Sequence, residues 1–434
     1  MFKTEKNVTD WIYSFITGET SRKTTSKRNL NHLHDFLATI DNPHLKLKTV
    51  HVAGTNGKGS TVAYIRQSFM ESGYKVATFT SPFITCFGER MSINNVPMPE
   101  DKLIYYAEQL KALLPVSVLA FTYFDILTLI SFLYFLDEAI DIAIYETGIG
   151  GRLDSTNVIQ PLATAITNVG HDHADVLGDT QLERAMEKLG IVKKDVPLFT
   201  TEEDPFLIAK FDEVCQNKQA ELYHALKGAR LRHMDESGVN FEWGRYKEIE
   251  INMHGEHQFK NACLAVHILD YLKSTSQYAN LDPTAIQKTK WQGRFEFFPK
   301  IDRPVVIDGA HNIEGIRALI STVQEIYPNY VHKYVFSALD TKDYKQMIDL
   351  LAEDADRLSF VTGTHSKAID AKVMYEYHNH NHKVDSDFYQ HFEAAVDEQL
   401  SNLKDEQVLV FCGSLYFISD VRRYLFEEDG RFLI

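Results

Sequence analysis

The sequence has few cysteines, and none of them is placed to form a disulfide framework or a metal site. The four are Cys86, Cys215, Cys263 and Cys412, and no CxxC pair or Cys/His metal spacing is present. Isolated cysteines of this kind are typical of buried free thiols in a reducing compartment. The N-terminal segment also lacks the uninterrupted apolar stretch of a signal peptide. We therefore expect a cytoplasmic protein.

Long hydrophobic runs are also missing. The longest, ILTLISFLYFL at 126–136, is closed off by Asp125 and Asp137. It is well short of the ~20 apolar residues that cross a bilayer. The run therefore predicts a buried helix, and we expect no membrane partner.

Positive charge is in deficit. The chain has 45 Lys and Arg against 60 Asp and Glu, which gives a formal net charge of -15. A DNA or RNA partner needs a basic face, so nucleic-acid binding is excluded as the main activity. Small anions remain candidate ligands, because a loop of backbone N–H groups binds phosphate against an unfavourable overall charge.

The pattern of apolar residues predicts an α/β fold. Segments of strand length alternate with segments of helical spacing, the order that builds a parallel sheet covered by helices. The predicted strands are 45–54, 75–80, 140–145 and 162–169, and the predicted helices are 60–72 and 126–136. At 434 residues, the chain is long enough for two or three domains.

A second, smaller α/β series begins near residue 300. It consists of predicted strands at 304–307, 333–337 and 407–412 and predicted helices at 315–327 and 344–355. The polar, turn-rich segment between Ser274 and Arg294 is where we place the join. The sequence therefore predicts one domain over 1–290 and another over 291–434.

The strongest local signal is a glycine-rich segment where the first strand gives way to a helix. It comprises Gly54, Thr55, Asn56, Gly57, Lys58, Gly59, Ser60 and Thr61. Glycines allow backbone N–H groups to approach phosphate, a lysine neutralises its charge, and a helix N-terminus adds positive potential. The segment departs from the strict GxxxxGK[ST] form, because Gly59 stands between the lysine and the first hydroxyl. It nevertheless predicts a phosphate site.

Polar residues follow two further strands, at the edge where parallel sheets bind their ligands. Glu146 comes directly after the strand at 140–145, and Mg²⁺ coordination is the natural role for its carboxylate. His171, Asp172 and His173 follow the strand at 162–169, and one histidine is a candidate metal ligand or acid/base, although loop histidines are commonly solvated. On physical grounds alone, nothing distinguishes Lys188 from neighbouring lysines on a solvated helix face.

The second half contributes weaker signals. Arg294 lies at the domain join, and Asp308 and His311 end the strand at 304–307. Such groups suit a nucleotide bound at a domain interface. The alternating histidines of YHNHNHK at 377–383, namely His378, His380 and His382, resemble a metal box in an extended segment. Their polar surroundings favour a solvated loop instead.

Taken in order, the motifs closely resemble the folate branch of the muramyl (Mur) ligase family, the dihydrofolate and folylpolyglutamate synthases. The matching segments are HVAGTNGKGST at 51–61, TSPF at 80–83, GERMSIN at 88–94, ETGIGGRLDSTN at 146–157, TNVGHDH at 167–173, EKLGI at 187–191, GEHQFKNACLA at 255–265, GRFE at 293–296, DGAHN at 308–312 and GSLYFISDVR at 413–422. The resemblance implies a P-loop parallel-sheet ATPase domain followed by a smaller Rossmann-like α/β domain.

The resemblance also implies roles for particular residues. Residues 54–61 would hold the ATP phosphates, with Lys58 as the charge clamp. The remaining ATP contacts would be Asn261, Arg294, Asp308 and His311, the Mg²⁺ ligands Ser81, Glu146 and His173, and the folate-binding residues Phe83, Phe124, Arg152 and Asp154. Lys188 would be carbamylated by CO₂ and bind a second Mg²⁺, which requires a lysine pKa low enough for a neutral amine. Lys58, His173 and Lys188 are then the candidate catalytic residues.

Several positions depart from the family pattern. The family's TxFExLT segment has Asp125 in place of its glutamate, and the usual Asp-Lys-Asp reads Thr341, Lys342 and Asp343. Ile313 also replaces the proline that commonly follows DGAHN. These changes affect fine contacts and leave the phosphate and metal set intact.

The implied activity is an ATP-dependent ligation of L-glutamate through an acyl phosphate. The acceptor is the γ-carboxylate of a reduced folate, and the form Arg152-Leu-Asp154 favours dihydropteroate as a second acceptor. One alternative is a Mur-type cell-wall ligase, which carries a UDP-binding domain ahead of its phosphate loop, whereas 53 residues precede Gly54 here. A nucleotide-gated switch or binding protein is another alternative, and we expect a monomer.

Overall fold

The computed structural model describes residues 2–15, 29–115, 121–172, 174–298 and 303–426. The chain forms two compact units, and each is described by itself. The first comprises Met1–Arg230, Glu242–Ile249 and Lys260–Thr289. The second comprises Leu231–Phe241, Glu250–Phe259 and Lys290–Ile434. Helix α9 (Glu256–Thr275) and the three-stranded sheet of β9 (Ala229–Asp235), β10 (Gly238–Trp243) and β11 (Tyr246–Ile251) have residues in both.

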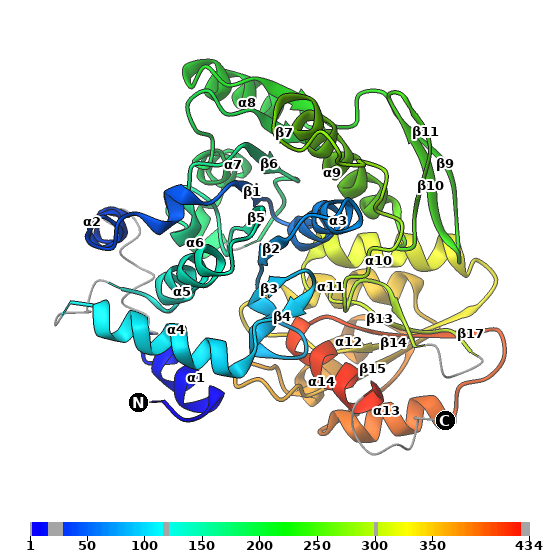
Figure 1. The fold of residues 1–434 in the computed structure, drawn as a ribbon. Helices are drawn as coiled ribbons and strands as arrows, with labels where there is room; N and C mark the ends of the chain where they lie inside the picture. The colour runs from blue at the N-terminus through cyan, green and yellow to red at the C-terminus, as the bar shows by residue number, and fades with distance from the viewer. Residues whose placement is uncertain (1, 16–28, 116–120, 173, 299–302, 427–434) are drawn as a thin grey trace. The chain divides into compact units, whose positions relative to one another are not determined.

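The first unit is built on an eight-stranded sheet with the order β4-β3-β2-β5-β1-β6-β7-β8. The strands are β1 (Thr49–Ala53), β2 (Val76–Phe79), β3 (Met91–Ile93), β4 (Val96–Pro97), β5 (Ile142–Glu146), β6 (Ala163–Ile166), β7 (Leu198–Thr200) and β8 (Leu222–His224). Strands β2, β5, β1, β6, β7 and β8 pair in parallel, whereas β3 and β4 pair antiparallel at one edge. Because β1 is flanked by β5 and β6, the carboxyl ends of these three strands meet at one edge (Figure 1).

Helices cover this sheet because their apolar residues repeat at helical spacing. They are α1 (Glu5–Tyr13), α2 (Asn31–Thr39), α3 (Lys58–Glu71), α4 (Glu100–Leu113), α5 (Tyr123–Asp137), α6 (Ala174–Leu177), α7 (Gln181–Leu189) and α8 (Pro205–Asn217), with short 3-10 turns at Pro43–Lys46, Phe87–Arg90 and Ser155–Val158. Helix α5 is the predicted apolar helix, and the side chain of Thr122 caps its N-terminus. Among the described residues, no helix is long and apolar enough to span a bilayer.

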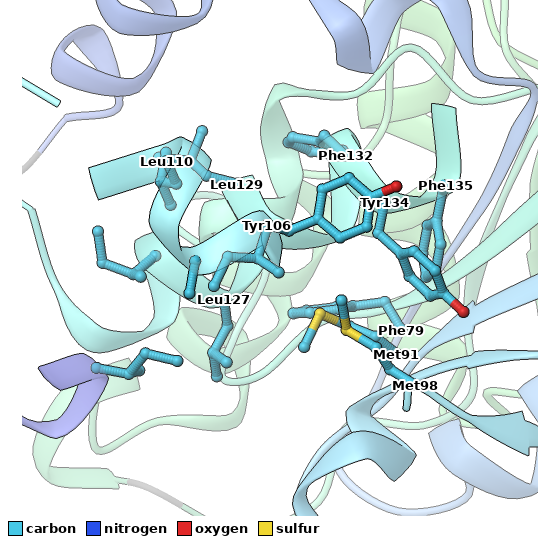
Figure 2. Close-up of a cluster of buried hydrophobic side chains, with 14 of the residues drawn as sticks. Phe79, Met91, Met98, Tyr106, Leu110, Leu127, Leu129, Phe132, Tyr134 and Phe135 are labelled. Carbon is cyan, nitrogen blue, oxygen red and sulfur yellow. The ribbon is translucent and has the colours of Figure 1, made fainter. Parts of the chain in front are cut away.

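The core of the first unit lies between α4, α5 and the sheet. Figure 2 shows rings and thioethers from four elements packed together, including Phe79 of β2, Met91 of β3, Tyr106 of α4 and Phe132 of α5. All four side chains are almost completely buried. Truncating one such ring to alanine costs about 3–5 kcal/mol of stability. This core holds in place the sheet whose strands β1, β5 and β6 have their carboxyl ends at one edge.

The second unit contains a six-stranded sheet with the order β12-β13-β17-β14-β15-β16. Its strands are β12 (Glu296–Phe297), β13 (Val305–Ile307), β14 (Val331–Phe336), β15 (Arg357–Val361), β16 (Asp385–Tyr389) and β17 (Gln407–Cys412). Its helices are α10 (Ile313–Ile326), α11 (Tyr344–Asp354), α12 (Ala371–Asn381), α13 (Phe392–Ser401) and α14 (Leu415–Phe426). Apart from the antiparallel strand β12, all pairings are parallel. The predicted α/β class is therefore confirmed.

The alternating histidines contradict the prediction of a solvated loop. His378 and His380 lie in α12, and His382 is its C-cap residue. A helix brings residues four apart to the same face, so the rings of His378 and His382 stack with centroids 5.4 Å apart. His378 is buried, His382 contacts Asp349 at 2.8 Å, and His380 is exposed. The prediction was wrong because the segment is polar in composition and yet forms a partly buried helix.

A buried histidine in β1 makes stability depend on pH. Burial lowers the pKa of His51 from 6.5 to about 3, and its Nε2 lies 2.8 Å from the hydroxyl of Thr156. Below pH 6.5 the unfolded chain binds a proton here that the folded chain rejects. The free energy of unfolding therefore falls as the pH drops from 6.5 towards 3.

We predict that His51→Gln reduces this pH dependence, because glutamine does not titrate. In denaturant unfolding between pH 4 and 6.5, the slope should decrease by about 1.4 kcal/mol per pH unit. His380→Gln, the same substitution at an exposed position, is measured alongside as the control. An unaltered slope in His51→Gln would show that His51 does titrate in the folded protein.

Candidate active site

The glycine-rich segment lies between β1 and α3, as predicted. Gly57 is the N-cap residue of α3 and has a φ of 85°, in the left-handed region that favours glycine. A Cβ at Gly57 would also collide with the side chain of Asn261 on α9. The helix begins at Lys58, and the first backbone N–H groups of a helix have no carbonyl partner within it. Thr61 is the residue whose N–H closes the first turn, by donating to the Gly57 carbonyl at 2.9 Å. The loop therefore has the geometry of an anion site.

The segment after β6 clamps this loop, and sequence reasoning did not single out that role. Asn168 accepts from the Asn56 N–H at 3.1 Å through Oδ1 and donates to the Asn56 carbonyl at 3.0 Å through Nδ2. The Thr167 hydroxyl donates to the same carbonyl at 2.5 Å, and the Gly170 N–H donates to the Thr55 hydroxyl at 2.9 Å. The available signal was the polar TNVG segment directly after a strand.

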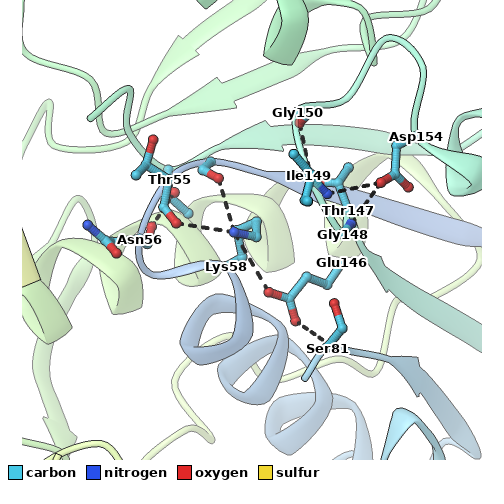
Figure 3. Close-up of polar contacts among 12 residues, drawn as sticks. Thr55, Asn56, Lys58, Ser81, Glu146, Thr147, Gly148, Ile149, Gly150 and Asp154 are labelled. Carbon is cyan, nitrogen blue, oxygen red and sulfur yellow. Dashed lines mark hydrogen bonds and ion pairs between the residues drawn. The ribbon is translucent and has the colours of Figure 1, made fainter. Parts of the chain in front are cut away.

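Lys58 and Glu146 face each other beside the loop (Figure 3). The Lys58 ammonium donates to the carbonyl oxygens of Gly54 at 3.1 Å and Thr55 at 3.2 Å, and lies 4.0 Å from Glu146 Oε1. Glu146 ends β5 and is 5% exposed, and its Oε2 accepts the Ser81 N–H at 3.2 Å. The predicted residues Lys58, Ser81 and Glu146 are thus brought together.

Lys188 lies near the C-terminus of α7 and is only 2% exposed. Burial, together with the positive charge of Lys58, lowers its pKa to about 7. A large share of this amine is therefore neutral at physiological pH. Its helix also supplies Arg184, which donates to the Gly170 carbonyl at 3.0 Å. His173, the other predicted catalytic residue of this region, lies outside the described residues.

The chemistry of the described residues fits a divalent cation bound with phosphate. Glu146 supplies a buried carboxylate and Ser81 a hydroxyl beside it, and oxygen donors of this kind suit Mg²⁺. The Thr61 hydroxyl, in the first turn of α3, is buried and has no hydrogen-bond partner in the part of the chain that the structure describes. No cluster of three or more His, Cys, Asp or Glu occurs in the described ranges.

Two of the predicted folate-binding residues adjoin the loop after Glu146. The Phe124 ring lies so close to Gly148 that a Cβ there would contact it at 2.7 Å. Asp154 is 6% exposed, and its carboxylate accepts the N–H groups of Gly148 at 2.9 Å, Ile149 at 3.2 Å and Thr156 at 3.0 Å. The observed contacts of Asp154 therefore hold the loop in shape.

The other two predicted folate-binding residues have different partners. Arg152 donates to Glu187 Oε1 from Nε at 3.1 Å and from Nη2 at 2.7 Å, and its side chain is half-exposed. This pair attaches the loop to α7 beside Lys188. Phe83 lies 5.2 Å from the guanidinium of Arg90.

In the second unit, the predicted residues Arg294, Asp308 and His311 lie around the end of β13. Asp308 is 6% exposed, and its Oδ2 accepts the Phe295 N–H at 2.7 Å. Burial raises the pKa of Asp308, an effect that Arg294 opposes. His311 Nδ1 lies 2.7 Å from the carbonyl oxygen of Gly309. The three residues therefore form one polar group within this unit.

We predict that Asn168→Asp weakens nucleotide binding, because it replaces the donor to the Asn56 carbonyl with a repelling carboxylate oxygen. Loss of one such bond is worth about 1–2 kcal/mol, or roughly tenfold in affinity. Titration with a non-hydrolysable ATP analogue measures the effect. Asn402→Asp, at an exposed helix C-cap, is the control. Unchanged affinity in folded Asn168→Asp would contradict the clamp.

Comparison with known proteins gives the family. The Mur ligase middle domain matches residues 52–269, and the Mur ligase glutamate ligase domain matches residues 293–415. The chain is 34% identical to the dihydrofolate synthase/folylpolyglutamate synthase of Bacillus subtilis, over 98% of this chain and 100% of that protein.

Solved structures show the same fold. The folylpolyglutamate synthase of Thermotoga maritima superposes with a TM-score of 0.83 at 24% identity, covering 99% of both chains. An FPGS–AMPPCP–folate complex superposes with a TM-score of 0.81 at 27% identity, over 97% of this chain and 99% of that one. On its ordered motifs, fold and full-length relatives, the chain belongs to the Mur ligase family, in the branch of the folylpolyglutamate and dihydrofolate synthases.

Proposed function

We propose that this protein is an ATP-dependent ligase that adds L-glutamate to the γ-carboxylate of a reduced folate, and also to dihydropteroate. The observation that carries the proposal is the arrangement at the sheet edge. There the Lys58 ammonium donates to the Gly54 carbonyl of the phosphate loop at 3.1 Å and lies 4.0 Å from the Glu146 carboxylate. Such a site binds and polarises a nucleoside triphosphate. The relative from Bacillus subtilis bears the names of both activities, which supports two acceptors.

The first step transfers the γ-phosphoryl group of ATP to the acceptor carboxylate. The bond from γ-phosphorus to the bridging oxygen breaks, a carboxylate oxygen–phosphorus bond forms, and ADP leaves. Lys58 stands beside the loop and neutralises charge on the phosphate oxygens as they shift. Backbone N–H groups at the N-terminus of α3, which begins at Lys58, hold the phosphates in line. Asn168 keeps the loop in that shape before ATP arrives.

The second step makes the amide. The amine of L-glutamate attacks the carbonyl carbon of the acyl phosphate, the carbon–oxygen bond to phosphate breaks, and phosphate leaves. The amine's surplus protons pass to phosphate and water. Residues Arg294, Asp308 and His311 of the second unit, with Asn261, are proposed to bind ATP. Phe83, Phe124, Arg152 and Asp154 are proposed to form or support the folate pocket.

Two Mg²⁺ ions are proposed, held by Ser81, Glu146 and His173 and by Lys188 as a carbamate. When bound, they offset the negative charge of the phosphates. A lysine carbamate forms from the neutral amine and CO₂, and the lowered pKa of Lys188 makes the neutral form available. The same burial shields the modified side chain from bulk water.

The proposed function is tested by ADP release from ATP and Mg²⁺ with L-glutamate, comparing tetrahydrofolate, dihydropteroate and no pterin. Product masses are read in parallel. We expect turnover with both pterins and products heavier by one glutamyl residue. Turnover with tetrahydrofolate alone would contradict the proposal that dihydropteroate is a second acceptor. ADP release at the same rate with and without pterin and glutamate would contradict the ligase assignment and favour a nucleotide-gated switch.

For Lys188, we predict that Lys188→Ala lowers kcat at least a hundredfold and that added formate or acetate partly restores it. The reason is that a short carboxylate can replace the lost carbamate oxygens. Lys194→Ala, at an exposed position nearby, is the control and should keep its rate. ¹³C NMR with labelled bicarbonate should show a carbamate signal that Lys188→Ala lacks. Full activity of Lys188→Ala without rescue would contradict the carbamate.

A further inference from the structure

Arg90 is a buried cation enclosed by aromatic rings. Its guanidinium carbon lies 5.2 Å from the centroid of Phe83, 5.7 Å from Phe87 and 5.7 Å from Tyr123. The Tyr13 ring stacks on Tyr123 with centroids 5.4 Å apart. Arg90 is 8% exposed, whereas Tyr13 is 40% exposed, so the outer ring lies closer to solvent than the charge. We call these five residues the Arg90 cage.

Arg90 has no carboxylate partner in the described parts of the chain. Its Nε is buried without a hydrogen-bond acceptor there. The adjacent Glu89 does not neutralise it, because the Glu89 carboxylate accepts the N–H groups of Ile84 at 2.8 Å, Thr85 at 3.0 Å and Cys86 at 3.2 Å. Glu89 instead shapes the turn that follows Phe83.

A buried guanidinium with no carboxylate partner among the described residues needs a physical explanation. Removing an ion from water costs several kcal/mol, and an arginine is rarely buried without a carboxylate or phosphate. The attraction between a cation and aromatic ring faces offsets part of this cost. They satisfy none of the guanidinium N–H donors, which prefer two oxygens of one anion. The Arg90 cage therefore has the composition of a site for a carboxylate carried by an aromatic ligand.

The Arg90 cage adjoins the proposed folate pocket. Phe83 follows Ser81 by two residues, and the Ser81 N–H donates to Glu146. Two peptide units span at most about 7–8 Å, so Phe83 links the cage to the phosphate site. On its other side, Tyr123 precedes Phe124, whose ring packs on Gly148 of the loop after Glu146.

We propose that Arg90 binds the α-carboxylate of the glutamate moiety of the folate substrate. This inference rests on the proposed function. A reduced folate carries two carboxylates, and once the γ-carboxylate is directed to the phosphate site, the α-carboxylate needs a cation of its own. Dihydropteroate has a single carboxylate, which is the one that reacts. It therefore has no second carboxylate for Arg90 to bind. Arg90 is thus a specificity-determining residue that favours folates bearing glutamate over dihydropteroate.

The first test compares two pterins in Arg90→Gln. A hydrogen-bonded charge pair is worth about 1.5–3 kcal/mol, so KM for tetrahydrofolate should rise roughly 10–150-fold. The ratio of kcat/KM for tetrahydrofolate to that for dihydropteroate should fall by a similar factor. An unchanged ratio, whether kcat/KM falls equally with both pterins or with neither, would overturn the assignment. Thermal unfolding of each variant shows whether it is folded.

The controls separate charge from packing. Arg90→Lys keeps the charge but loses the planar, two-donor geometry, so its KM for tetrahydrofolate should fall between those of wild type and Arg90→Gln. Arg245→Gln is the matched control, because Arg245 also lies over a ring, that of Tyr246 at 5.1 Å, yet it is exposed and pairs with Asp270. It should leave the kinetics unchanged. A comparable KM increase in Arg245→Gln would contradict the specific role of Arg90.

A second test uses the wild-type enzyme and does not depend on how a variant folds. The probe is tetrahydrofolate with its α-carboxylate converted to an amide. Wild type should show a KM for this α-amide raised by the same factor as Arg90→Gln shows for tetrahydrofolate, and Arg90→Gln should not distinguish the two. An α-amide that wild type uses as well as tetrahydrofolate would overturn the inference. Absence of turnover with every pterin would contradict the proposed function instead.

Discussion

The register of β1 against β5 and β6 is the constraint on which the site depends. In this register Val52 lies beside Glu146 and Ala53 beside Ile166. The phosphate loop, the carboxylate and the TNVG segment therefore leave the sheet at the same level. A slip of one residue would turn each side chain to the opposite face and separate Glu146 from Lys58. The buried core between α4, α5 and the sheet prevents such a slip.

Local charge, rather than net charge, suits the site to anions. The chain carries a formal net charge of -15, yet Lys58, Arg90 and Lys188 are largely or fully buried within one unit. The three cations have different surroundings. Lys58 donates hydrogen bonds to backbone carbonyls, and Arg90 lies among aromatic rings. Burial lowers the pKa of Lys188 to about 7. Buried cations of this kind are costly and mark binding sites. They place positive charge locally in a protein that is acidic overall.

The sequence was sufficient for features that depend on local pattern. The strand at 407–412 and the glycine-rich turn followed from periodicity and spacing, and the structure confirms them. Glu146 was predicted directly after a strand, and it is the last residue of β5. It was insufficient where distant segments meet. The Asn168 clamp joins residues more than a hundred positions apart, and the tyrosine rings of the Arg90 cage come from segments distant from Arg90 in the chain. The low pKa of Lys188 likewise arises from tertiary burial.

The most direct test of the account is the fate of the acceptor's oxygen. The reaction is run with ATP, L-glutamate and tetrahydrofolate labelled with ¹⁸O at both oxygens of its γ-carboxylate, and the released phosphate is analysed by mass spectrometry. An acyl phosphate formed at this site predicts that one ¹⁸O atom passes from the carboxylate to phosphate for each amide made. Phosphate without ¹⁸O, released alongside glutamylated product, would contradict the mechanism.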